Sequence, residues 1–304
     1  MHSNCKINRK QQTKEGQLNK NQNSRANAEE KSVSERKTGF TGKDHTFVIC
    51  AYKENKNLEK AVKSLMAQTV KSNIIISTST PNMYIFSVAT KYDIQVFIRN
   101  EESAIAKDWN FGYMQAETAL ITIVHQDDIY EPDYLENVLR AVNKNPDMLI
   151  CFTDYYEIRN GKKVMNNKLL IIKRIMLLPM LLKCARRSKF IRRRILSFGN
   201  PICCPSVTFN RVNAGDNIFD ENYKNSCDYK TWVVMSKMDG SFIYIPDALM
   251  GHRIYEGSET TKNIKENIRT KEDLEIFRSF WPDKIADFIC RFYSESEKSN
   301  QLTN

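Results

Sequence analysis

Apolar residues in the first half of the chain switch repeatedly between short β-rich runs and helical spacing. The run TFVICAY at 46–52 predicts a strand, and apolar residues recur at helical spacing over 58–66. Further strands are predicted in NIIISTS, DIQVFIRN and ALITIVHQ, with helical stretches at 83–91 and in DWNFGYMQAET between them. Strands that alternate with helices predict an α/β fold whose mainly parallel sheet has helices on both faces.

The second half continues this pattern and adds two helical regions. DYLENVLRAVNKNP predicts an amphipathic helix, and DMLICFTDYYEIRNGKKV predicts a strand that leads into a turned pair. After a basic, apolar segment, the chain resumes with CCPSVTFNR, a helix near 228–238 and the strand SFIYIPDAL. We expect one α/β domain at 46–261, interrupted by a basic amphipathic helical insert at 162–198 and followed by a helical extension at 262–304.

Residues 1–45 contain almost no periodic apolar pattern and are rich in Asn, Gln, Lys, Ser and Glu. Such a segment cannot bury enough apolar surface to offset the entropy of ordering, so we expect a disordered basic arm. No apolar h-region precedes the first strand and no run of about 18 apolar residues occurs, so neither a secretory signal nor a membrane span is predicted. Eight cysteines without a CxxC pair favour reduced thiols in the cytoplasm.

The positive charge is concentrated in two segments of the chain. Residues 162–194 hold twelve Lys or Arg and no Asp or Glu, and the arm holds ten basic and five acidic residues. Of the 46 basic and 36 acidic residues in the chain, 24 and 31 remain elsewhere, so the body of the protein is net acidic. This distribution excludes a protein that is basic over its whole surface.

The segment 162–194 combines this charge with many Leu, Ile and Met residues. A basic amphipathic helix of this composition can lie in the headgroup plane of an anionic membrane, here the inner face of the cell membrane. Nucleic acid is the rival partner, but the apolar half of the segment contains no Tyr or Phe to stack on bases, which favours lipid. The alternative is a helical insert that packs on the domain with a solvated basic rim.

Two adjacent carboxylates, Asp127 and Asp128, follow the apolar run ITIV at the end of a predicted buried strand. Ligands of parallel sheets bind at the carboxyl ends of the strands, where Tyr52, Glu54 and His125 are also expected. Neighbouring ionised carboxylates repel unless a cation or hydrogen bonds compensate, and Mg²⁺ or Mn²⁺ bound to a pyrophosphate is a common compensator. The alternative is that both aspartates cap the helix at EPDYLENVL.

These segments together resemble the family-2 glycosyltransferases, which have the GT-A fold. The family motif D-x-D-D-x-x-x-P corresponds to HQDDIYEP, and the family pattern SLxxQ corresponds to SLMAQ at 64–68. IIISTSTPN, AIAKDWNFGYMQA and CDYKTWVVMSKMDGSFIYIP are similar to further family segments and occur in the family order over 46–261. The resemblance implies a nucleoside-diphosphate-sugar donor, a Mn²⁺ or Mg²⁺ cofactor and transfer with inversion.

Two positions depart from the family pattern. His125 stands where the first Asp of D-x-D is expected, which leaves Asp127 as the matched metal ligand. Thr78 stands where members often have an Asp that contacts the nucleoside. Asp108 is then a candidate for a polar contact to the base or ribose, and it is equally suited to be the N-cap of the helix that begins at WNFGY.

The resemblance also implies roles for residues late in the chain. Asp228 is the expected general base, which takes the acceptor proton as that oxygen attacks the anomeric carbon, and it is also a possible helix N-cap. Trp232, one turn later, is expected to stack on a sugar acceptor, although core packing is the alternative. His252 is expected to bind the metal or a phosphate, whereas a lone His is more often structural.

The expected donor site lies along the same edge of the sheet. The Tyr52 ring is expected to cover the nucleobase or, alternatively, to complete the core. Glu54 is expected to hydrogen-bond the base or ribose, or else to be a solvated loop carboxylate. The full set of expected donor contacts is Ala51, Tyr52, Glu54, Thr78, Asp108, Asn110, His125, Gln126 and Arg253.

We therefore expect a cytoplasmic, membrane-peripheral glycosyltransferase that acts on a saccharide or lipid-linked acceptor, as in cell-surface polysaccharide synthesis. A nucleotidyltransferase of similar α/β layout is one alternative, but it would carry a Gly-rich phosphate loop, and CAYKENKN contains no Gly. The other alternative is a catalytically dead protein that binds a polyanion or a membrane, because His125 and Thr78 replace expected carboxylates.

Overall fold

The computed structural model describes residues 39–254 and 268–298. Most of the expected arm lies outside these residues. The compact unit begins at Thr41, a short helix η1 covers Gly42–Asp44, and the first strand begins at His45, one residue before the predicted range. His45 is fully buried, and its ring nitrogens bond the hydroxyls of Ser72 (2.7 Å) and Thr122 (2.8 Å). These bonds fix the start of the strand inside the domain.

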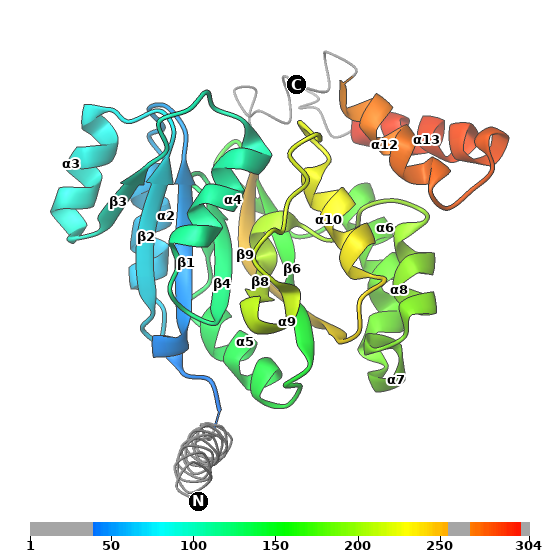
Figure 1. The fold of residues 1–304 in the computed structure, drawn as a ribbon, viewed down its shortest axis with the longest axis horizontal. Coiled ribbons are helices and arrows are strands. Elements are labelled where there is room, and N and C mark those ends of the chain that lie inside the picture. Colours follow the sequence, from blue (N-terminus) through cyan, green and yellow to red (C-terminus); the bar gives the residue numbers. More distant parts are fainter. Residues whose placement is uncertain (1–38, 255–267, 299–304) are drawn as a thin grey trace, which may run out of the picture. The chain divides into compact units, whose positions relative to one another are not determined.

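The first half of the unit forms a parallel sheet, as the alternating pattern predicts. Its neighbours pair in the order β3-β2-β1-β4. The carboxyl ends of these strands lie at the top in Figure 1. The strands are β1 (His45–Ala51), β2 (Asn73–Thr78), β3 (Gln95–Ile98) and β4 (Leu120–His125).

The second half extends the same sheet as β4-β8-β6-β9-β5. β8 runs antiparallel to both β4 and β6, whereas β6 and β9 are parallel, so the sheet is mixed but mostly parallel. A two-residue turn with positive φ at Asn160 (48°) and Gly161 (77°) joins β6 to β7, as is common in hairpins. The strands are β5 (Ile129–Tyr130), β6 (Met148–Arg159), β7 (Lys162–Val164), β8 (Val207–Asn210) and β9 (Ser241–Ile254).

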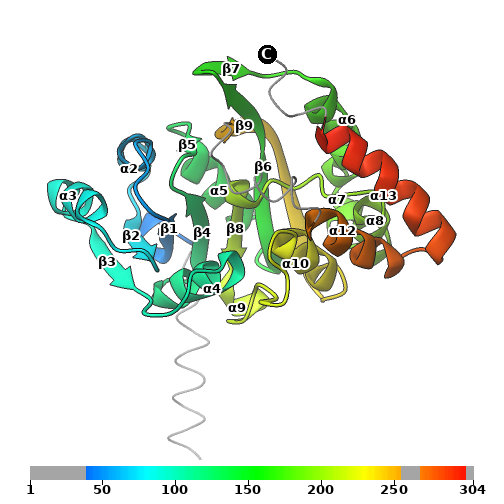
Figure 2. The ribbon, with the colours of Figure 1, turned by 90° about the horizontal axis from the view of Figure 1, so that it is seen from above.

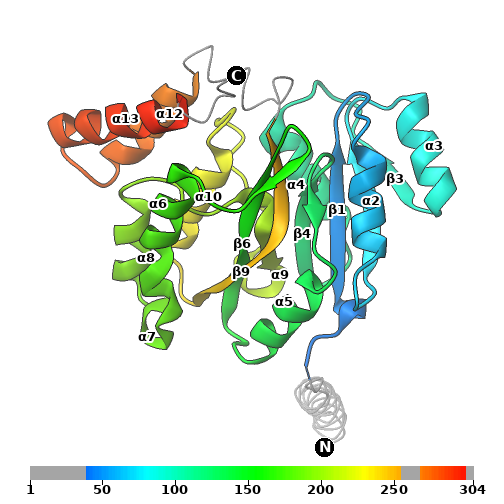
Figure 3. The same ribbon diagram turned by 180° about the vertical axis from the view of Figure 1, so that it is seen from behind.

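Helices cover both faces of the sheet, which confirms the expected α/β architecture. α4 and α10 lie in front of the sheet in Figure 1, and α2 and α5 lie in front of it in the reverse view of Figure 3. α3 flanks the β3 edge. These helices are α2 (Leu58–Met66), α3 (Met83–Tyr92), α4 (Ile105–Gln115), α5 (Tyr134–Asn143) and α10 (Cys227–Met235), and short turns η3 (Cys204–Ser206) and α9 (Arg211–Ala214) flank β8.

The basic insert is a series of short helices rather than one amphipathic helix. Residues 162–164, predicted to belong to it, form strand β7, and Pro179, which lacks an N–H, lies in the 3-10 turn that follows the first helix. Arg192 is 1% exposed and donates to the carbonyl oxygens of Ser236, Met238 and Gly240. The elements are α6 (Lys168–Leu177), η2 (Leu178–Leu181), α7 (Lys183–Arg186) and α8 (Lys189–Leu196).

The extension after the sheet forms a helix pair within its described part. α12 (Ile268–Arg278) and α13 (Asp283–Lys298) pack together beside the insert, as Figure 2 shows from above. The predicted extension at 262–267 and 299–304 lies outside the described residues. Within the described ranges, no helix combines the length and the apolar character needed to cross a bilayer.

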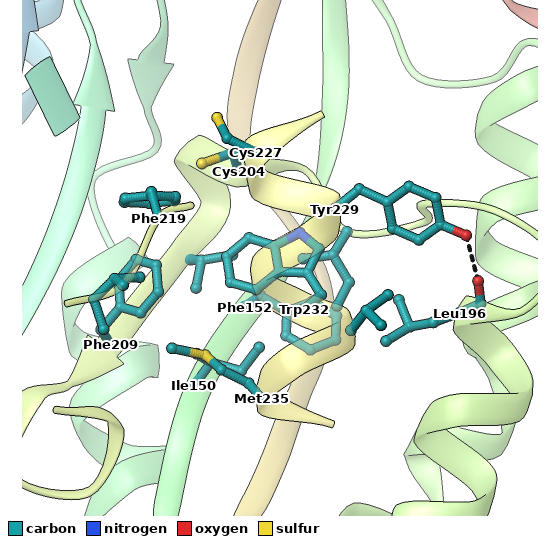
Figure 4. Close-up of a cluster of buried hydrophobic side chains, with 14 of the residues drawn as sticks. Ile150, Phe152, Leu196, Cys204, Phe209, Phe219, Cys227, Tyr229, Trp232 and Met235 are labelled. Atoms are coloured by element: carbon teal, nitrogen blue, oxygen red, sulfur yellow. Dashed lines mark hydrogen bonds between the residues drawn. The ribbon is translucent and has the colours of Figure 1, made fainter. Parts of the chain in front are cut away.

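The main core lies between the sheet and helices α8 and α10. Trp232 of α10 stacks on Phe209 of β8, with 5.7 Å between ring centroids, and Figure 4 shows both rings near Phe152. The Tyr229 hydroxyl of α10 donates to the carbonyl oxygen of Leu196 in α8. The insert and the helix that carries Asp228 therefore share one core.

Candidate active site

The carboxyl ends of β1 and β4 lie side by side, with Cys50 paired to His125. Gln126 links the two ends, because its Oε1 accepts from the Tyr52 N–H (3.1 Å) and its Nε2 donates to the Tyr52 carbonyl (2.7 Å). Gln126 was a predicted donor contact, but both ends of its amide are engaged by backbone. Its role in the structure is to position Tyr52, which is half-buried at the sheet edge.

Three titratable side chains meet just beyond these strand ends. Asp128 is fully buried, and its Oδ1 lies 3.1 Å from His252 Nδ1 on β9, while its Oδ2 lies 3.5 Å from His125 Nδ1. The backbone N–H of Arg253 also donates to Asp128 Oδ1 (2.9 Å). One ligand atom from each of His125, Asp128 and His252 lies within 4.8 Å of the others. Pairing of β5 with β9 brings these residues together across the chain.

The cluster has a definite charge pattern. Burial alone raises the pKa of Asp128, but the His252 charge and hydrogen bond, His125 and the Arg253 N–H outweigh it and lower that pKa. Burial alone lowers the pKa of His252, but the negative charge of Asp128 raises it above its ordinary value. Burial lowers the pKa of His125, and the carboxylates offset this only in part. Of the two imidazoles, His125 therefore has the lower pKa.

The chemistry of these side chains fits a divalent transition ion. His125 Nε2 is buried and has no hydrogen-bond partner among the described residues. The Nδ1 of His252 is held by Asp128, and such a carboxylate commonly orients a histidine that binds metal through its other nitrogen. Imidazole nitrogens beside carboxylate oxygens suit Mn²⁺ better than Mg²⁺, which prefers oxygen ligands.

Asp127, the predicted metal ligand, lies beside this cluster and is half-buried. Its negative charge opposes the lowering of the His125 pKa and adds to the raising of the His252 pKa, and its carbonyl oxygen accepts from Arg253 Nε (2.9 Å). The side chain that actually joins the two imidazoles is its neighbour Asp128. Helix α5 starts only at Tyr134, after Asp133 as its N-cap, so neither aspartate has the alternative role of helix cap.

The remaining predicted donor residues fall into two groups. Tyr52 and Glu54 lie at the edge of the sheet, where Glu54 is exposed. Ala51 and Thr78 are paired residues at the ends of β1 and β2 and are at most 4% exposed. The Thr78 hydroxyl accepts from the Thr80 N–H (3.0 Å), so it shapes the turn after β2.

Asp108 and Asn110 are engaged in contacts within the protein. The alternative role predicted for Asp108, the N-cap of α4, does not apply, because α4 already begins at Ile105. The Asp108 carboxylate instead bonds the guanidinium of buried Arg99 (2.9 Å). Asn110 is 7% exposed, donates to the Phe219 carbonyl (2.8 Å) and accepts from the Phe219 N–H (2.9 Å). Both ends of the Asn110 amide thus hold the backbone at Phe219.

Asp228 lies in the first turn of α10, for which Ser226 is the N-cap. Its Oδ2 accepts from Asn200 Nδ2 (2.9 Å), and its Oδ1 accepts from the Tyr229 N–H (2.7 Å). Burial raises the pKa of Asp228, and the positive charges of Arg269 and Lys173 offset this only in part. A raised pKa suits a carboxylate that takes a proton during a reaction.

Asp228 and Asp128 border a common region of the protein. Burial raises the pKa of the Cys203 thiol, and both carboxylates raise it further, whereas Lys173 lowers it. Lys173 of α6 donates to the Tyr155 hydroxyl (3.0 Å), and the Tyr155 ring centroid lies 6.3 Å from that of His252. The basic insert therefore reaches the edge of the site.

A family comparison agrees with this arrangement. The sequence model described as "Glycosyl transferase family 2" matches residues 46–219, more than half of the chain. The chain belongs to glycosyl transferase family 2.

Curated relatives of this family-2 protein carry the same general description. An uncharacterized glycosyltransferase of Rickettsia prowazekii (strain Madrid E) is 22% identical over 242 residues, which cover 75% of this chain and 69% of the relative. An uncharacterized glycosyltransferase of Rickettsia typhi (strain ATCC VR-144 / Wilmington) is 20% identical over 249 residues, with 78% and 70% covered.

Solved structures confirm the GT-A fold of the family-2 protein. S. aureus TarS 1–349 in complex with UDP-GlcNAc has a TM-score of 0.57 at 15% identity, covering 86% of this chain and 74% of that one. The mannosyltransferase PcManGT from Pyrobaculum calidifontis, in complex with GDP-Man and Mn²⁺, has a TM-score of 0.59 at 12% identity, covering 84% and 71%. At these identities, the likeness establishes the fold alone.

One predicted site residue of the family-2 domain is misplaced. Trp232 was expected to stack on an acceptor, but it is 0% exposed and lies within the core of Figure 4. Its indole N–H is buried without a hydrogen-bond partner among the described residues. Asp228 lies in the first turn of α10 at the edge of the site, whereas Trp232, one turn later, packs on β8. The alternative of core packing is the correct one for Trp232.

Sequence reasoning missed three residues that shape the site. Asp128 had a visible signal, the double aspartate, but its enclosure depends on His252, which is distant in the chain. Asn200, which holds Asp228, lies in the turn FGNP and carries no chemical motif. Lys173 was counted only as part of the basic insert, because composition does not distinguish a lysine that faces the site from one that faces solvent.

Proposed function

We propose that the protein transfers a sugar from a nucleoside-diphosphate sugar to a hydroxyl of a saccharide or lipid-linked acceptor, with inversion, as in the assembly of a cell-surface polysaccharide. The observation that supports this most strongly is the cluster of His125, Asp128 and His252 at the strand ends, with Asp228 bordering the same region. Two solved structures of the same fold contain UDP-GlcNAc and GDP-Man, respectively.

The proposed cation site combines the cluster with Asp127. Asp127 and His252 are the proposed ligands, Asp128 orients His252, and the unpartnered Nε2 of His125 is a further candidate ligand. A bound Mn²⁺ or Mg²⁺ would neutralise negative charge that develops on the leaving diphosphate. The Arg253 guanidinium, fixed through its Nε at the Asp127 carbonyl, is the proposed cationic contact to the diphosphate.

Asp228 is the proposed general base. It takes the proton of the acceptor hydroxyl as that oxygen attacks the anomeric carbon from the face opposite the diphosphate, which inverts the configuration. Asn200 holds one carboxylate oxygen and thereby fixes the direction of the side chain. Tyr52 and Glu54, at the end of β1, are the proposed contacts to the base and ribose.

A screen of nucleotide sugars with Mn²⁺ tests the proposal. We expect one donor to release its nucleoside diphosphate together with a glycosylated acceptor, and Asp127→Ala to abolish turnover without loss of the fold. Asp133→Ala, an exposed aspartate in the same connection between strand and helix, is the matched control and should leave turnover unchanged. Pyrophosphate release would instead indicate a nucleotidyltransferase, and near-normal turnover by Asp127→Ala would remove Asp127 from the site.

A further inference from the structure

One side of the basic insert exposes an apolar strip. The strip comprises six aliphatic residues of α6, η2 and the next position, each between 38% and 60% exposed: Ile171, Ile172, Ile175, Leu178, Leu181 and Leu182. The opposite side of the same segment is anchored, because Leu170, Leu177 and Met180 are buried. A contiguous apolar surface of this kind usually marks a site of interaction with a protein or a membrane.

The positive charges of the insert have two different roles. Arg174 and Arg192 act within the fold: Arg174 bonds Asp154 (2.6 Å), and Arg192 is buried among carbonyl oxygens. Lys168 and Lys183 flank the strip at its two ends, are exposed, and form no ion pair with any described residue. Cations therefore border the aliphatic side chains, and residues 162–194 contain no Asp or Glu to oppose an anionic surface.

A basic pocket adjoins the α7 end of the strip. It is a cavity of about 530 Å³ between α5, α7 and the start of β9, and no acidic residue lines it. Five basic residues do: Arg140, Lys144, Lys183, Arg186 and Arg187.

Most of this charge is unopposed. Glu136 pairs with Arg140 and Asp147 with Arg187, whereas Lys144, Lys183 and Arg186 form no ion pair within the described ranges. The Nε of Arg186 is buried and has no hydrogen-bond partner among the described residues. A phosphate group is the ligand that such a set of donors suits best.

The pocket is distinct from the candidate active site. Tyr244 lines the pocket and His252 belongs to the cluster; their partners on β6, Phe152 and Glu157, lie five strand residues apart, which is about 17 Å. The strip connects the two regions, since α6 contacts the site edge through Lys173 and Tyr155, and α7 follows the strip at the pocket. Figures 1 and 3 both show α6 and α7 along the same flank of the sheet.

We propose that the strip and the pocket form a docking face for a phospholipid leaflet that contains anionic lipids. The aliphatic side chains enter the headgroup region, and the pocket holds the phosphate of a lipid headgroup. Flanking lysines and an aliphatic strip match this surface, whereas a nucleic-acid partner would call for aromatic side chains that stack on bases. The face adds to the proposed sugar transfer and places the edge formed by Tyr155 and His252 near the leaflet, where a lipid-linked acceptor would be reached.

Vesicle flotation of the full chain tests this proposal without any nucleotide sugar, so it is independent of the outcome for catalysis. We expect flotation with vesicles of phosphatidylcholine and phosphatidylglycerol in equal parts, and much weaker flotation with phosphatidylcholine alone. Ile175→Asp with Leu182→Asp should reduce the partition coefficient about tenfold or more. Lys144→Glu with Lys183→Glu should reduce it about fivefold for each charge removed and should flatten its dependence on salt.

Matched controls lie on the other side of the domain. Met83 is 82% exposed on α3 and Lys60 is exposed on α2, so Met83→Asp and Lys60→Glu change the same properties and should float like the wild type. Circular dichroism checks the fold of each variant, and the milder Ile172→Ser serves if a double variant unfolds. Failure of the wild type to float, or equal flotation of strip variants and controls, would overturn the proposal. The proposal would also be overturned if the wild type did not bind vesicles but self-associated, and if the strip variants abolished that self-association.

Discussion

Two carboxylates at the edge of the sheet occupy opposite environments. At the end of β4, Asp128 is enclosed by two imidazoles and a backbone N–H, which together lower its pKa. At the start of α10, burial raises the pKa of Asp228, because the opposing effects of the Asn200 amide, the Tyr229 N–H and the charges of Arg269 and Lys173 are smaller. The same side chain is thus kept ionised in one region and made ready to accept a proton in the other.

The difference originates in what each segment of the chain brings to the carboxylate. β9 brings His252 and the Arg253 N–H directly to Asp128. The turn before β8 brings only Asn200, a neutral side chain, to Asp228. A charged side chain bonded to the carboxylate in the first region suits the orientation of a cation ligand, and a neutral bonded side chain in the second suits a general base.

The largest expected effect comes from removal of the proposed base. Asp228→Asn keeps the shape of the side chain but cannot take a proton, so kcat for sugar transfer should fall about 10²- to 10⁴-fold. Asp239→Asn, at a fully exposed position on the loop after α10, is the control and should keep wild-type kcat.

Because the folded pKa of Asp228 lies above its unfolded value, the ionised carboxylate destabilises the fold at neutral pH, and the melting temperature of Asp228→Asn should be equal or higher. A variant with normal kcat would remove Asp228 from the mechanism.

A smaller effect is expected at the other carboxylate. Asp128→Asn removes the charge that orients His252, so calorimetry with Mn²⁺ should show affinity weakened about 10- to 100-fold. Asp228→Asn should bind Mn²⁺ like the wild type in the same titration. Equal weakening in both variants would contradict the division of roles between the two regions.

The acidic limb of the pH profile sharpens the comparison. Since burial raises the pKa of Asp228 above its ordinary 3.8, kcat should fall as pH decreases through a midpoint above that value. The groups that act against burial are Arg269, Lys173, the Asn200 amide and the Tyr229 N–H, so Lys173→Met should move the midpoint upward. Lys168→Met, at an exposed position on the same helix, should leave it unchanged. A midpoint at or below 3.8 would contradict the assignment.

The smallest effect on catalysis is expected at Trp232. Because this side chain is buried against Phe209, Trp232→Phe should lower the free energy of unfolding by about 1–2 kcal/mol in a urea titration. The acceptor KM should stay the same, since the ring has no access to the site. A raised KM with unchanged stability would restore the role in acceptor binding that the sequence predicted.

Local patterns predicted the strands and helices well because each depends on periodicity within a short segment. Strands β1 to β4 and helix α3 lie close to their predicted ranges, and the turn between β6 and β7 lies at the Asn160-Gly161 pair. Contacts between different elements could not be predicted: Arg99 bonds Asp108 nine residues later, and Phe219 and His252 reach Asn110 and Asp128 from distant parts of the chain. A motif supplies the type of side chain, whereas its partner comes from a strand or loop that only the fold brings near.

The buried guanidinium of Arg192 has a consequence for how this chain can be shortened. Its hydrogen bonds with the carbonyl oxygens of Ser236, Met238 and Gly240 satisfy the peptide groups that follow α10. Excision of α8 would remove the donor of these three hydrogen bonds, at a net cost of about 1 kcal/mol for each. The basic insert thus also stabilises the end of α10, the helix that carries Asp228. A shortened protein without α8 would need another donor for these carbonyl oxygens to keep α10 in place.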